Sequence, residues 1–389
     1  MPIVRFLILQ PTPFCNISCK YCYLPDRSSK AAMSLETINR IFSDLFSSGW
    51  VGPELMVAWH VGEPLALPVA YYRDAFAAID RLTPSATTIQ YTFQTNGMLI
   101  DDEWCGFFKA HHVQVGVSVD GPRDVHDANR ITRSGAPTFA RTIAGIRCLQ
   151  RNDVDFGIIT VLSGAALGRA GEFYDFYCRE GIRGICFNAE EIEGSNESTS
   201  LTGREAEYDG FLRTFWNMNV ASNNLFYIRE FNEILEKIMT PQECGNSLVE
   251  PFMHLNVDWQ GNYSTFSPEF LGHKNEYYGD FIIGNFYKNR LVECLESASF
   301  LRMRNDVAEG VALCRNSCEY FPICGGGSPV NKLYENGTVA STETMFCRLN
   351  VKLPADIAME IIENSADALR ARLPGATQPD MAGLLRPRP

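Results

Sequence analysis

The feature that most constrains the fold is a regular alternation of short β-rich runs with amphipathic runs over the first half of the chain. Each strand-then-helix unit takes about 30 to 40 residues, which is typical of a parallel sheet with right-handed crossovers. Six units fall short of the eight of a complete (β/α) barrel, so the sequence predicts an α/β fold with a partial, open (β/α)6 barrel. The six predicted strands lie at residues 3–10, 54–60, 87–94, 113–119, 155–162 and 184–188.

This rhythm ends near residue 190, where the polar linker EGSNESTSLTG is followed by two helical segments. From Cys244 onward the chain is rich in loop residues and cysteines, which predicts a small domain that is stabilised by bound metal. The last residues are rich in Pro and Arg and are expected to be poorly ordered. We therefore predict a barrel domain at 1–225, a bridging helix and cysteine-rich domain at 226–365, and a flexible tail at 366–389.

Charge and cysteine content narrow the class of protein. The net charge of −12 argues against nucleic acid or anionic lipid as the main partner. The N-terminus lacks the features of a signal peptide, and no apolar run approaches the roughly 20 residues that span a bilayer. Thirteen cysteines without a secretion signal favour metal or redox chemistry in a reducing cytoplasm over disulfides.

The cysteines Cys15, Cys19 and Cys22 form a C-x3-C-x2-C array after the first predicted strand, and Tyr23 follows them. Three thiolates at this spacing suit three irons of a cubane [4Fe–4S] cluster, which leaves the fourth iron open. Core cysteines, or a zinc site completed from afar, are the alternatives. The array and its aromatic neighbour resemble the radical S-adenosylmethionine (SAM) superfamily. That resemblance implies that the open iron binds the amino and carboxylate groups of SAM, whose reductive cleavage gives a 5′-deoxyadenosyl radical.

Two motifs after the next strands agree with this resemblance. HVGEPL resembles the family's GGEP motif, with Val61 in place of the first glycine and with Gly62, Glu63 and Pro64 matching. The resemblance implies that this segment holds the SAM amino group. QTNG follows the third strand; its amides, Gln94 and Asn96, can hydrogen-bond a ribose, although an ordinary Asn-Gly turn is the alternative.

The fourth strand leads into SVDGPRDVHDANR, which contains Ser118, Asp120 and Arg130. The family resemblance makes Ser118 a ribose or carboxylate contact of SAM and Arg130 its carboxylate partner, because an Arg fork matches a carboxylate. An exposed salt bridge is the alternative for Arg130. Asn188, at the end of the sixth strand, is also predicted to face SAM.

A second cysteine group lies in CRNSCEYFPICGGGS and ETMFCRLN. It resembles the SPASM domain of peptide-modifying radical SAM enzymes, which usually binds two auxiliary [4Fe–4S] clusters. Two positions where the family has ligands of the first auxiliary cluster are Phe266 and Ser328 here, and Cys244 is the remnant of that site. We therefore predict one auxiliary cluster, with zinc as the alternative metal. Its four predicted ligands are Cys314, Cys318, Cys324 and Cys347. Five other cysteines are predicted to be small buried apolar residues: Cys105, Cys148, Cys178, Cys186 and Cys294.

A cluster with four cysteine ligands suits electron acceptance, which indicates a net oxidation. The segments TFSPEF and CGGGSPVNKLYENGTVASTETMFCR most resemble SPASM maturases of ribosomal peptides, in particular the cyclophane-forming Gly-rich-repeat (GrrM-like) group. Sulfatase maturases carry a catalytic Asp where this chain has Ser267, so Glu269 is the candidate base; Asp258 and a solvated loop acid are the alternatives.

The resemblance implies an enzyme that joins an aromatic side chain to a Cβ of a ribosomally made precursor peptide. A flavodoxin- or ferredoxin-type protein is the expected electron donor. The alternatives are a formylglycine-forming sulfatase-maturase-like oxidase, another peptide modification such as a thioether or epimerisation, and a non-enzymatic metal scaffold. Only fourteen residues precede the first cysteine, too few for a peptide-recognition domain, so leader binding is expected on the barrel, the SPASM surface or a separate protein.

Overall fold

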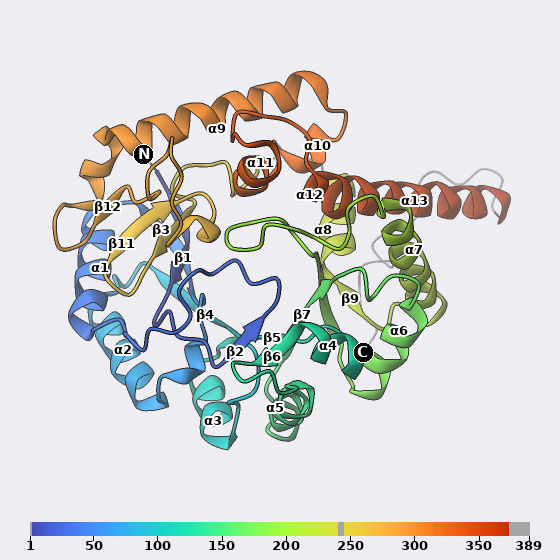
Figure 1. The fold of residues 1–389 in the computed structure, drawn as a ribbon, viewed down its shortest axis with the longest axis horizontal. Coiled ribbons are helices and arrows are strands. Elements are labelled where there is room, and N and C mark those ends of the chain that lie inside the picture. Colours follow the sequence, from blue (N-terminus) through green and yellow to red (C-terminus); the bar gives the residue numbers. More distant parts are fainter. Residues whose placement is uncertain (1, 240–244, 373–389) are drawn as a thin grey trace.

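The computed structural model of the chain describes residues 2–239 and 245–372. Six parallel strands form the centre of the fold and pair in chain order, as the sequence predicts (Figure 1). Helices follow these strands on the outer side of the curved sheet (Figure 1). The strands are β1 (Val4–Leu9), β3 (Val51–Trp59), β4 (Thr88–Thr95), β5 (Gln114–Ser118), β7 (Phe156–Leu162) and β8 (Gly184–Ala189). The helices are α1 (Leu35–Ser47), α2 (Val69–Leu82), α3 (Asp102–Ala110), α5 (Phe139–Arg151), α6 (Ala170–Arg179) and α7 (Glu205–Ala221).

The local sequence explains where these helices begin. The Ser34 side chain accepts a hydrogen bond from the backbone N–H of Thr37 at 3.0 Å, which caps α1 as predicted. The Asp101 carboxylate caps α3 in the same way, through the N–H of Trp104 at 3.0 Å. Each cap satisfies a donor that the first helical turn leaves unpaired.

Aromatic side chains fill the space between the sheet and its helices. Trp59 on β3 meets Tyr72 of α2 edge to face, with ring centroids 5.1 Å apart, and Phe76 stacks on Tyr91 of β4 at 3.8 Å. Phe93 and Phe108 are also fully buried in this core. Burial of each such side chain is worth roughly 1.5–3 kcal/mol, so the core holds the strand ends that carry the site in fixed positions.

The sheet continues beyond the six predicted strands. In the described residues it has ten strands, in the order β12-β11-β10-β1-β3-β4-β5-β7-β8-β9, and its two edge strands do not pair. The fold is therefore an open barrel, as predicted. The added strands are β9 (Tyr227–Ile228), β10 (His254–Val257), β11 (Asn262–Thr265) and β12 (Gly284–Asn285), and β10 pairs in parallel with β1. A segment assigned to the second domain thus shares the barrel's sheet, and the boundary at residue 225 stays a prediction.

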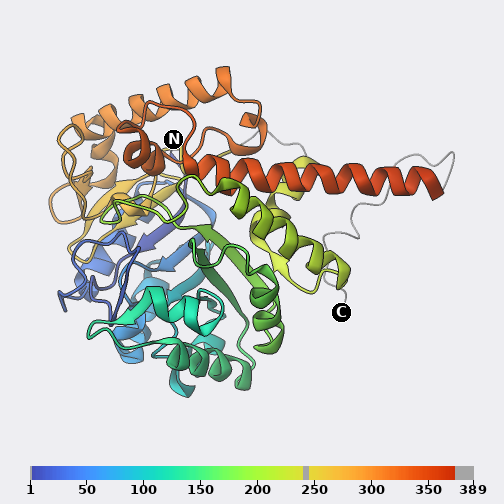
Figure 2. The ribbon, with the colours of Figure 1, turned by 45° about the vertical axis from the view of Figure 1, so that its right-hand side comes forward.

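The C-terminal half contains more helix than its loop-rich composition suggests. Figure 1 shows α9 crossing one end of the sheet, and Figure 2 shows α13 extending away from the body. The predicted tail at 366–389 begins within α13 and otherwise lies outside the described residues, as does Cys244. The remaining helices are α4 (Arg123–Asn129), α8 (Arg229–Met239), α9 (Ala298–Ser317), α10 (Phe321–Cys324), α11 (Pro329–Asn336), α12 (Met345–Cys347) and α13 (Leu353–Arg372). Short 3-10 or π turns are η1 (Pro64–Ala66), η2 (Pro268–Phe270), η3 (Leu291–Glu296) and η4 (Arg348–Lys352). In the described part of the chain, no helix combines the length and apolarity that a membrane span requires.

Candidate active site

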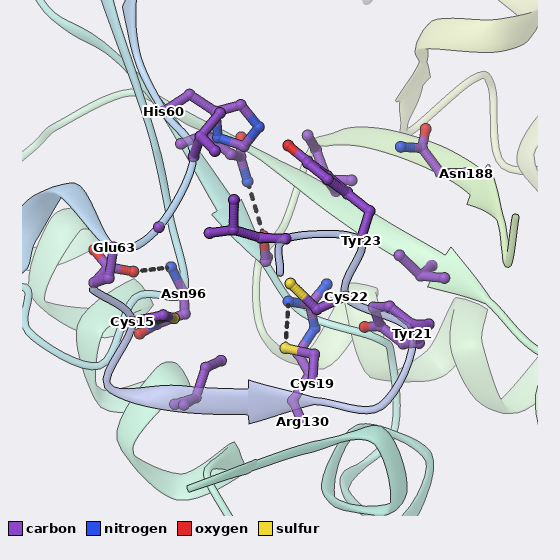
Figure 3. A pocket seen from close by; sticks show the side chains of 18 of the residues that line it. Cys15, Cys19, Tyr21, Cys22, Tyr23, His60, Glu63, Asn96, Arg130 and Asn188 are labelled. Carbon is purple, nitrogen blue, oxygen red and sulfur yellow. Dashed lines mark hydrogen bonds between the residues drawn. The ribbon is translucent and has the colours of Figure 1, made fainter. Parts of the chain in front are cut away.

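A cavity of about 270 Å³ lies at the carboxyl ends of the parallel strands (Figure 3). The loop after β1 and the ends of the next five strands contribute its walls, where enzymes with (β/α) barrels carry their chemistry. All but one of the predicted cofactor-binding residues line this cavity, and so do the first three cysteines and Glu269. The exception is Pro64, which opens η1 and whose carbonyl accepts a hydrogen bond from Tyr72 at 2.7 Å.

A small second sheet connects the loop that carries Cys15, Cys19 and Cys22 (the cysteine loop) to the rest of the barrel. Within it, β2 (Ile17–Cys19) pairs antiparallel with β6 (Arg130–Thr132), so that Cys19 lies opposite Arg130. The Arg130 guanidinium also donates to the Cys19 thiol at 3.7 Å (Figure 3). The Asn96 amide approaches the Cys15 thiol at 4.0 Å and donates to the Asn16 side chain at 2.6 Å. These contacts hold the thiols on one side of the cavity.

The turn of the HVGEPL motif depends on backbone conformations that favour glycine. Gly62 has φ of +88°, and a Cβ on it would lie 2.3 Å from the Thr12 carbonyl oxygen. Val61, which replaces the first glycine of the motif, keeps φ at +67°. A β-branched residue rarely adopts this conformation, so the substitution retains the shape of the turn at the expense of strain.

Glu63 is buried and accepts three hydrogen bonds. The donors are the N–H groups of Leu65 at 3.0 Å and Asn96 at 2.8 Å, and the hydroxyl of Thr95 at 2.7 Å. Burial raises its pKa to about 7, while these hydrogen bonds oppose the rise. A carboxylate has about four acceptor positions, so one remains for a ligand ammonium.

An amide side chain on β4 and a hydroxyl side chain on β5 lie next to each other. Gln94 donates to the Ser118 hydroxyl at 2.9 Å. The glycine at position 116 makes room for Gln94, because a Cβ there would lie 2.0 Å from the Gln94 side-chain oxygen. On β8, Asn188 accepts a hydrogen bond from Arg229 at 3.0 Å.

Arg130 forms a buried ion pair, and the exposed salt bridge considered for it is wrong. Its Nε lies 3.1 Å from Asp120 Oδ1, and the two side chains are 8% and 0% exposed. Asp120 also accepts hydrogen bonds from the Tyr21 hydroxyl and from the N–H of Val161. The ion pair therefore links the cysteine loop to the ends of β5 and β7.

Sequence reasoning missed several residues of this cavity. Tyr21 and Arg27 come from the cysteine loop, and His60 comes from the residue after β3. Burial lowers the pKa of His60 to about 4, so its imidazole is neutral near pH 7. Tyr21 directly precedes Cys22, and His60 directly precedes Val61, so proximity to the motifs was the available signal.

Three further carboxyl groups line the cavity and are called the glutamate wall below: Glu191, Glu193 and Glu269. Burial raises the pKa of Glu269 to about 7 and that of Glu191 to about 8, and it also raises that of Glu193. The Asn331 amide donates to Glu191 at 2.8 Å. By contrast, Asp258 caps the turn between β10 and β11, where it accepts from the N–H groups of Gln260 and Asn262, and Ser267 is buried outside the lining of the cavity.

The four C-terminal cysteines line a second cavity, of about 430 Å³. Cys314 and Cys318 lie at the end of α9, Cys324 ends α10, and Cys347 lies in α12. The three glycines that follow Cys324 all have positive φ, and the third donates its N–H to the Cys324 thiol at 3.1 Å. Such turns gather N–H groups around an anion, as at many Fe–S sites. Among the described residues, no three His, Cys, Asp or Glu side chains converge as ligands of a single metal ion.

The two positions without cysteine are both buried. Phe266, with φ of +72°, belongs to an apolar cluster with Phe270, Tyr278 and Phe281. Ser328 is 2% exposed at the start of α11. Apolar packing thus occupies the surroundings of Phe266. Of the five cysteines predicted to be structural, Cys178 is half-buried and the other four are buried.

Comparison with known proteins identifies the family. The sequence model of the radical SAM superfamily matches residues 9–176. An uncharacterised protein of Synechocystis sp. is 38% identical over 368 residues, which cover 93% of this chain and 92% of that protein. The chain belongs to the radical SAM superfamily.

Other relatives of this radical SAM enzyme have described activities or structures. A serine-type anaerobic sulfatase-maturating enzyme of Bacteroides thetaiotaomicron is 26% identical over 341 residues, 82% of this chain and 80% of that enzyme. The structure of native anSMEcpe with bound AdoMet has a TM-score of 0.76 and 19% identity, covering 94% of this chain and 99% of that chain. The structure of Streptococcus suis SuiB bound to precursor peptide SuiA has a TM-score of 0.61 and 14% identity, covering 89% of this chain and 76% of that chain. At these identities, the two structures show a shared fold.

Membership of the superfamily implies a [4Fe–4S] cluster and SAM. The residues present fit these groups, because three thiols share one wall of a cavity that also holds a buried carboxylate, a buried guanidinium and a Gln–Ser pair. The four-thiol cavity, with its glycine N–H groups, fits an auxiliary cluster.

Proposed function

We propose that this radical SAM enzyme installs an oxidative C–C cross-link of the cyclophane type in a ribosomally made precursor peptide. One observation carries the proposal. The position where sulfatase maturases have a catalytic Asp is Ser267, which is buried away from the cavity, whereas the carboxyl group of Glu269 lines the cavity. The candidate base therefore differs from that of the sulfatase-maturase pattern.

We assign the first cluster to Cys15, Cys19 and Cys22, and the auxiliary cluster to the four C-terminal cysteines. When bound, these groups and SAM supply a 5′-deoxyadenosyl radical that removes one hydrogen atom, and an acceptor for one electron. We assign the SAM amino group to Gly62, Glu63 and the turn that Pro64 begins, and its carboxylate to Arg130. Hydroxyl and amide groups are assigned to the rest of SAM: Gln94, Asn96, Ser118 and Asn188. Tyr23 lies toward His60 and Asn188 in Figure 3, and it lines the same cavity as the cysteines and the three glutamates.

The chain's own task is to aim one C–H bond and to remove one proton. Buried side chains such as Glu63, Asn96 and Arg130 form part of the cavity lining and limit the access of water, which protects a reactive radical from side reactions. Glu269 takes the proton that leaves as the new bond forms, because a base with a pKa near 7 is poised for transfer at neutral pH. The substrate thus loses one hydrogen atom, one proton and one electron, which amounts to two hydrogens.

A second candidate function is the oxidation of a Ser or Cys side chain to formylglycine. The similarity to the Bacteroides thetaiotaomicron sulfatase-maturating enzyme over 82% of this chain favours it. Both functions remove two hydrogens, so the mass change alone does not separate them.

Co-expression with a candidate precursor peptide, followed by tandem mass spectrometry, tests the proposal. A cross-link predicts a loss of two hydrogens together with missing backbone fragments inside a three-residue unit. An aldehyde that reacts with hydrazide reagents, with full backbone fragmentation around it, would instead establish formylglycine formation. Failure to form 5′-deoxyadenosine with dithionite would support a metal scaffold. The control is Cys19→Ala, which lacks one ligand of the first cluster.

Two partners belong to the same proposal. The substrate is a precursor peptide that binds at the cavity lined by the glutamate wall, and the cysteine content supports a reducing cytoplasm as the location of the enzyme. A flavodoxin- or ferredoxin-type protein supplies the electron for SAM cleavage. Exchange of the chemical reductant for each donor protein, with 5′-deoxyadenosine as the readout, tests this assignment.

A further inference from the structure

A lysine is buried beside the four C-terminal cysteines. Lys332 lies on α11 and is only 2% exposed. Lysine is almost never fully buried unless a partner compensates its charge. Its ammonium donates to the carbonyl oxygen of Gly310 at 3.0 Å, and among the ion pairs of the described residues none includes Lys332. A neutral carbonyl does not balance a buried charge, so another anion is needed.

The neighbouring thiols supply that anion when they are deprotonated. The Lys332 ammonium hydrogen-bonds the carbonyl of Gly310, which lies one turn before Cys314 on α9. A Cβ on Gly327 would lie within 3.5 Å of both the Cys347 thiol and the Lys332 side chain, so Lys332 lies beside Cys347 as well. Lys332 is not part of the cavity lining. It therefore lies beside two of the four ligand positions, on the protein side of the cavity, and its burial limits screening by water.

Two glycines make this position available. A Cβ on Gly310 would lie 2.3 Å from the Val339 carbonyl oxygen and 3.1 Å from the Lys332 ammonium, so glycine lets α9 approach both groups. Gly327 has φ of +76°, and a Cβ on it would lie 3.4 Å from the Cys347 thiol and 3.5 Å from the Lys332 side chain. The lysine, the two glycines and the thiols form one packed unit.

A cation in this place bears on the electron affinity of the site. Four thiolates around an oxidised [4Fe–4S] core carry a net negative charge, and one added electron increases it by one. A nearby buried positive charge stabilises the more negative state, because Coulomb energies are large where water is excluded. We propose that Lys332 is a positioning residue that raises the reduction potential of the auxiliary cluster and so makes it a better electron acceptor. The proposal rests on the assignment of a cluster to these cysteines and not on the product that the enzyme forms.

The chain offers a matched control at the same cavity. Lys352 lines the cavity, but its side chain is 26% exposed and its ammonium pairs with Glu343. Solvent and the carboxylate therefore screen its charge. Lys332→Met removes the buried charge with a side chain of similar length, and Lys332→Gln keeps a donor for Gly310 without the charge. Lys352→Met removes the screened charge.

The test is an EPR-monitored redox titration of the anaerobically reconstituted holoenzyme without peptide substrate. When the solution is held at the wild-type midpoint potential, both Lys332 variants are expected to show a ratio of reduced to oxidised auxiliary cluster that is at least tenfold lower. For a one-electron couple, this corresponds to a reduction potential that is lower by about 59 mV. Lys352→Met is expected to change that ratio less than threefold, and the first cluster is expected to keep its potential in all variants.

Three outcomes would overturn the proposal. A wild-type potential in both Lys332 variants would show that the charge does not tune the cluster. Zinc at the C-terminal cysteines would remove the redox site altogether. Loss of the cluster from both variants would assign Lys332 to folding of the site. Because no peptide is present, the result is independent of whether the product is a cross-link or formylglycine.

Discussion

The buried ion pair between Arg130 and Asp120 makes a quantitative prediction. Their closest atoms are 3.1 Å apart, and the two side chains are 8% and 0% exposed. Arg130→Met leaves the Asp120 carboxylate buried without its cation, which costs about 3–5 kcal/mol in free energy of unfolding. Arg73 and Glu103 form an exposed pair at 3.4 Å, in which the two side chains are 56% and 60% exposed. Arg73→Met should therefore cost only about 0–1 kcal/mol.

Urea unfolding under anaerobic, reducing conditions provides the assay, with tryptophan fluorescence as the signal because Trp59 and Trp104 are buried in the barrel. A double variant, Arg130→Met with Asp120→Asn, should recover part of the loss, since neither charge then remains unpaired. Equal small losses for Arg130→Met and Arg73→Met would refute the reasoning, because they would mean that water screens both pairs alike.

Three further predictions concern the same structure. Gly62→Ala should lose the first cluster and SAM binding, because its Cβ would lie 2.3 Å from the Thr12 carbonyl oxygen. Gly171→Ala, which has open space at its Cβ, is the control and should keep both. Iron content and SAM affinity are the measurements. Alanine at any one of the four C-terminal cysteines should lower iron from about eight to about four per chain with the first cluster retained; an unchanged iron content would place the auxiliary cluster elsewhere. The pKa of Glu269 rises from 4.5 to about 7 on folding, so the folded state binds more protons in this window and stability falls as pH rises through it. Glu269→Gln should make the free energy of unfolding, measured by urea titration, depend less on pH. The same variant should abolish peptide oxidation without abolishing SAM cleavage. An unchanged dependence of the unfolding free energy on pH would contradict the assignment of the base.

Much of the barrel could be predicted because its signals are local. The residues of α2 follow from helical spacing alone, and the Ser34 cap follows from the residue type before the first apolar turn. Many of the site residues could be found because they lie at the end of a parallel strand or just after it, and a parallel sheet brings all its carboxyl ends to one edge. This is why Gln94 and Ser118, separated by 24 positions, form a hydrogen bond.

What could not be predicted depends on contacts between distant segments. The buried residues of α9, such as Met303 and Val307, follow helical spacing, but Gly310 and Cys314 continue the same face and weaken its apolar signal. The burial of Arg130 depends on Asp120 and on the cysteine loop, which a sequence pattern cannot place around it. The glutamate wall joins residues after β8 to Glu269, and no periodicity connects them.

The parallel pairing of β1 with β10 has a consequence for the order in which the chain is made. Phe6 pairs with His254, so the backbone groups on one edge of β1 stay unpaired until a partner strand is synthesised about 250 residues later. At ribosomal rates of about 5–20 residues per second, that edge stays open for roughly 12–50 s. An unpaired strand edge invites pairing with other chains, so nascent chains halted before residue 254 should need chaperone protection that the finished protein does not.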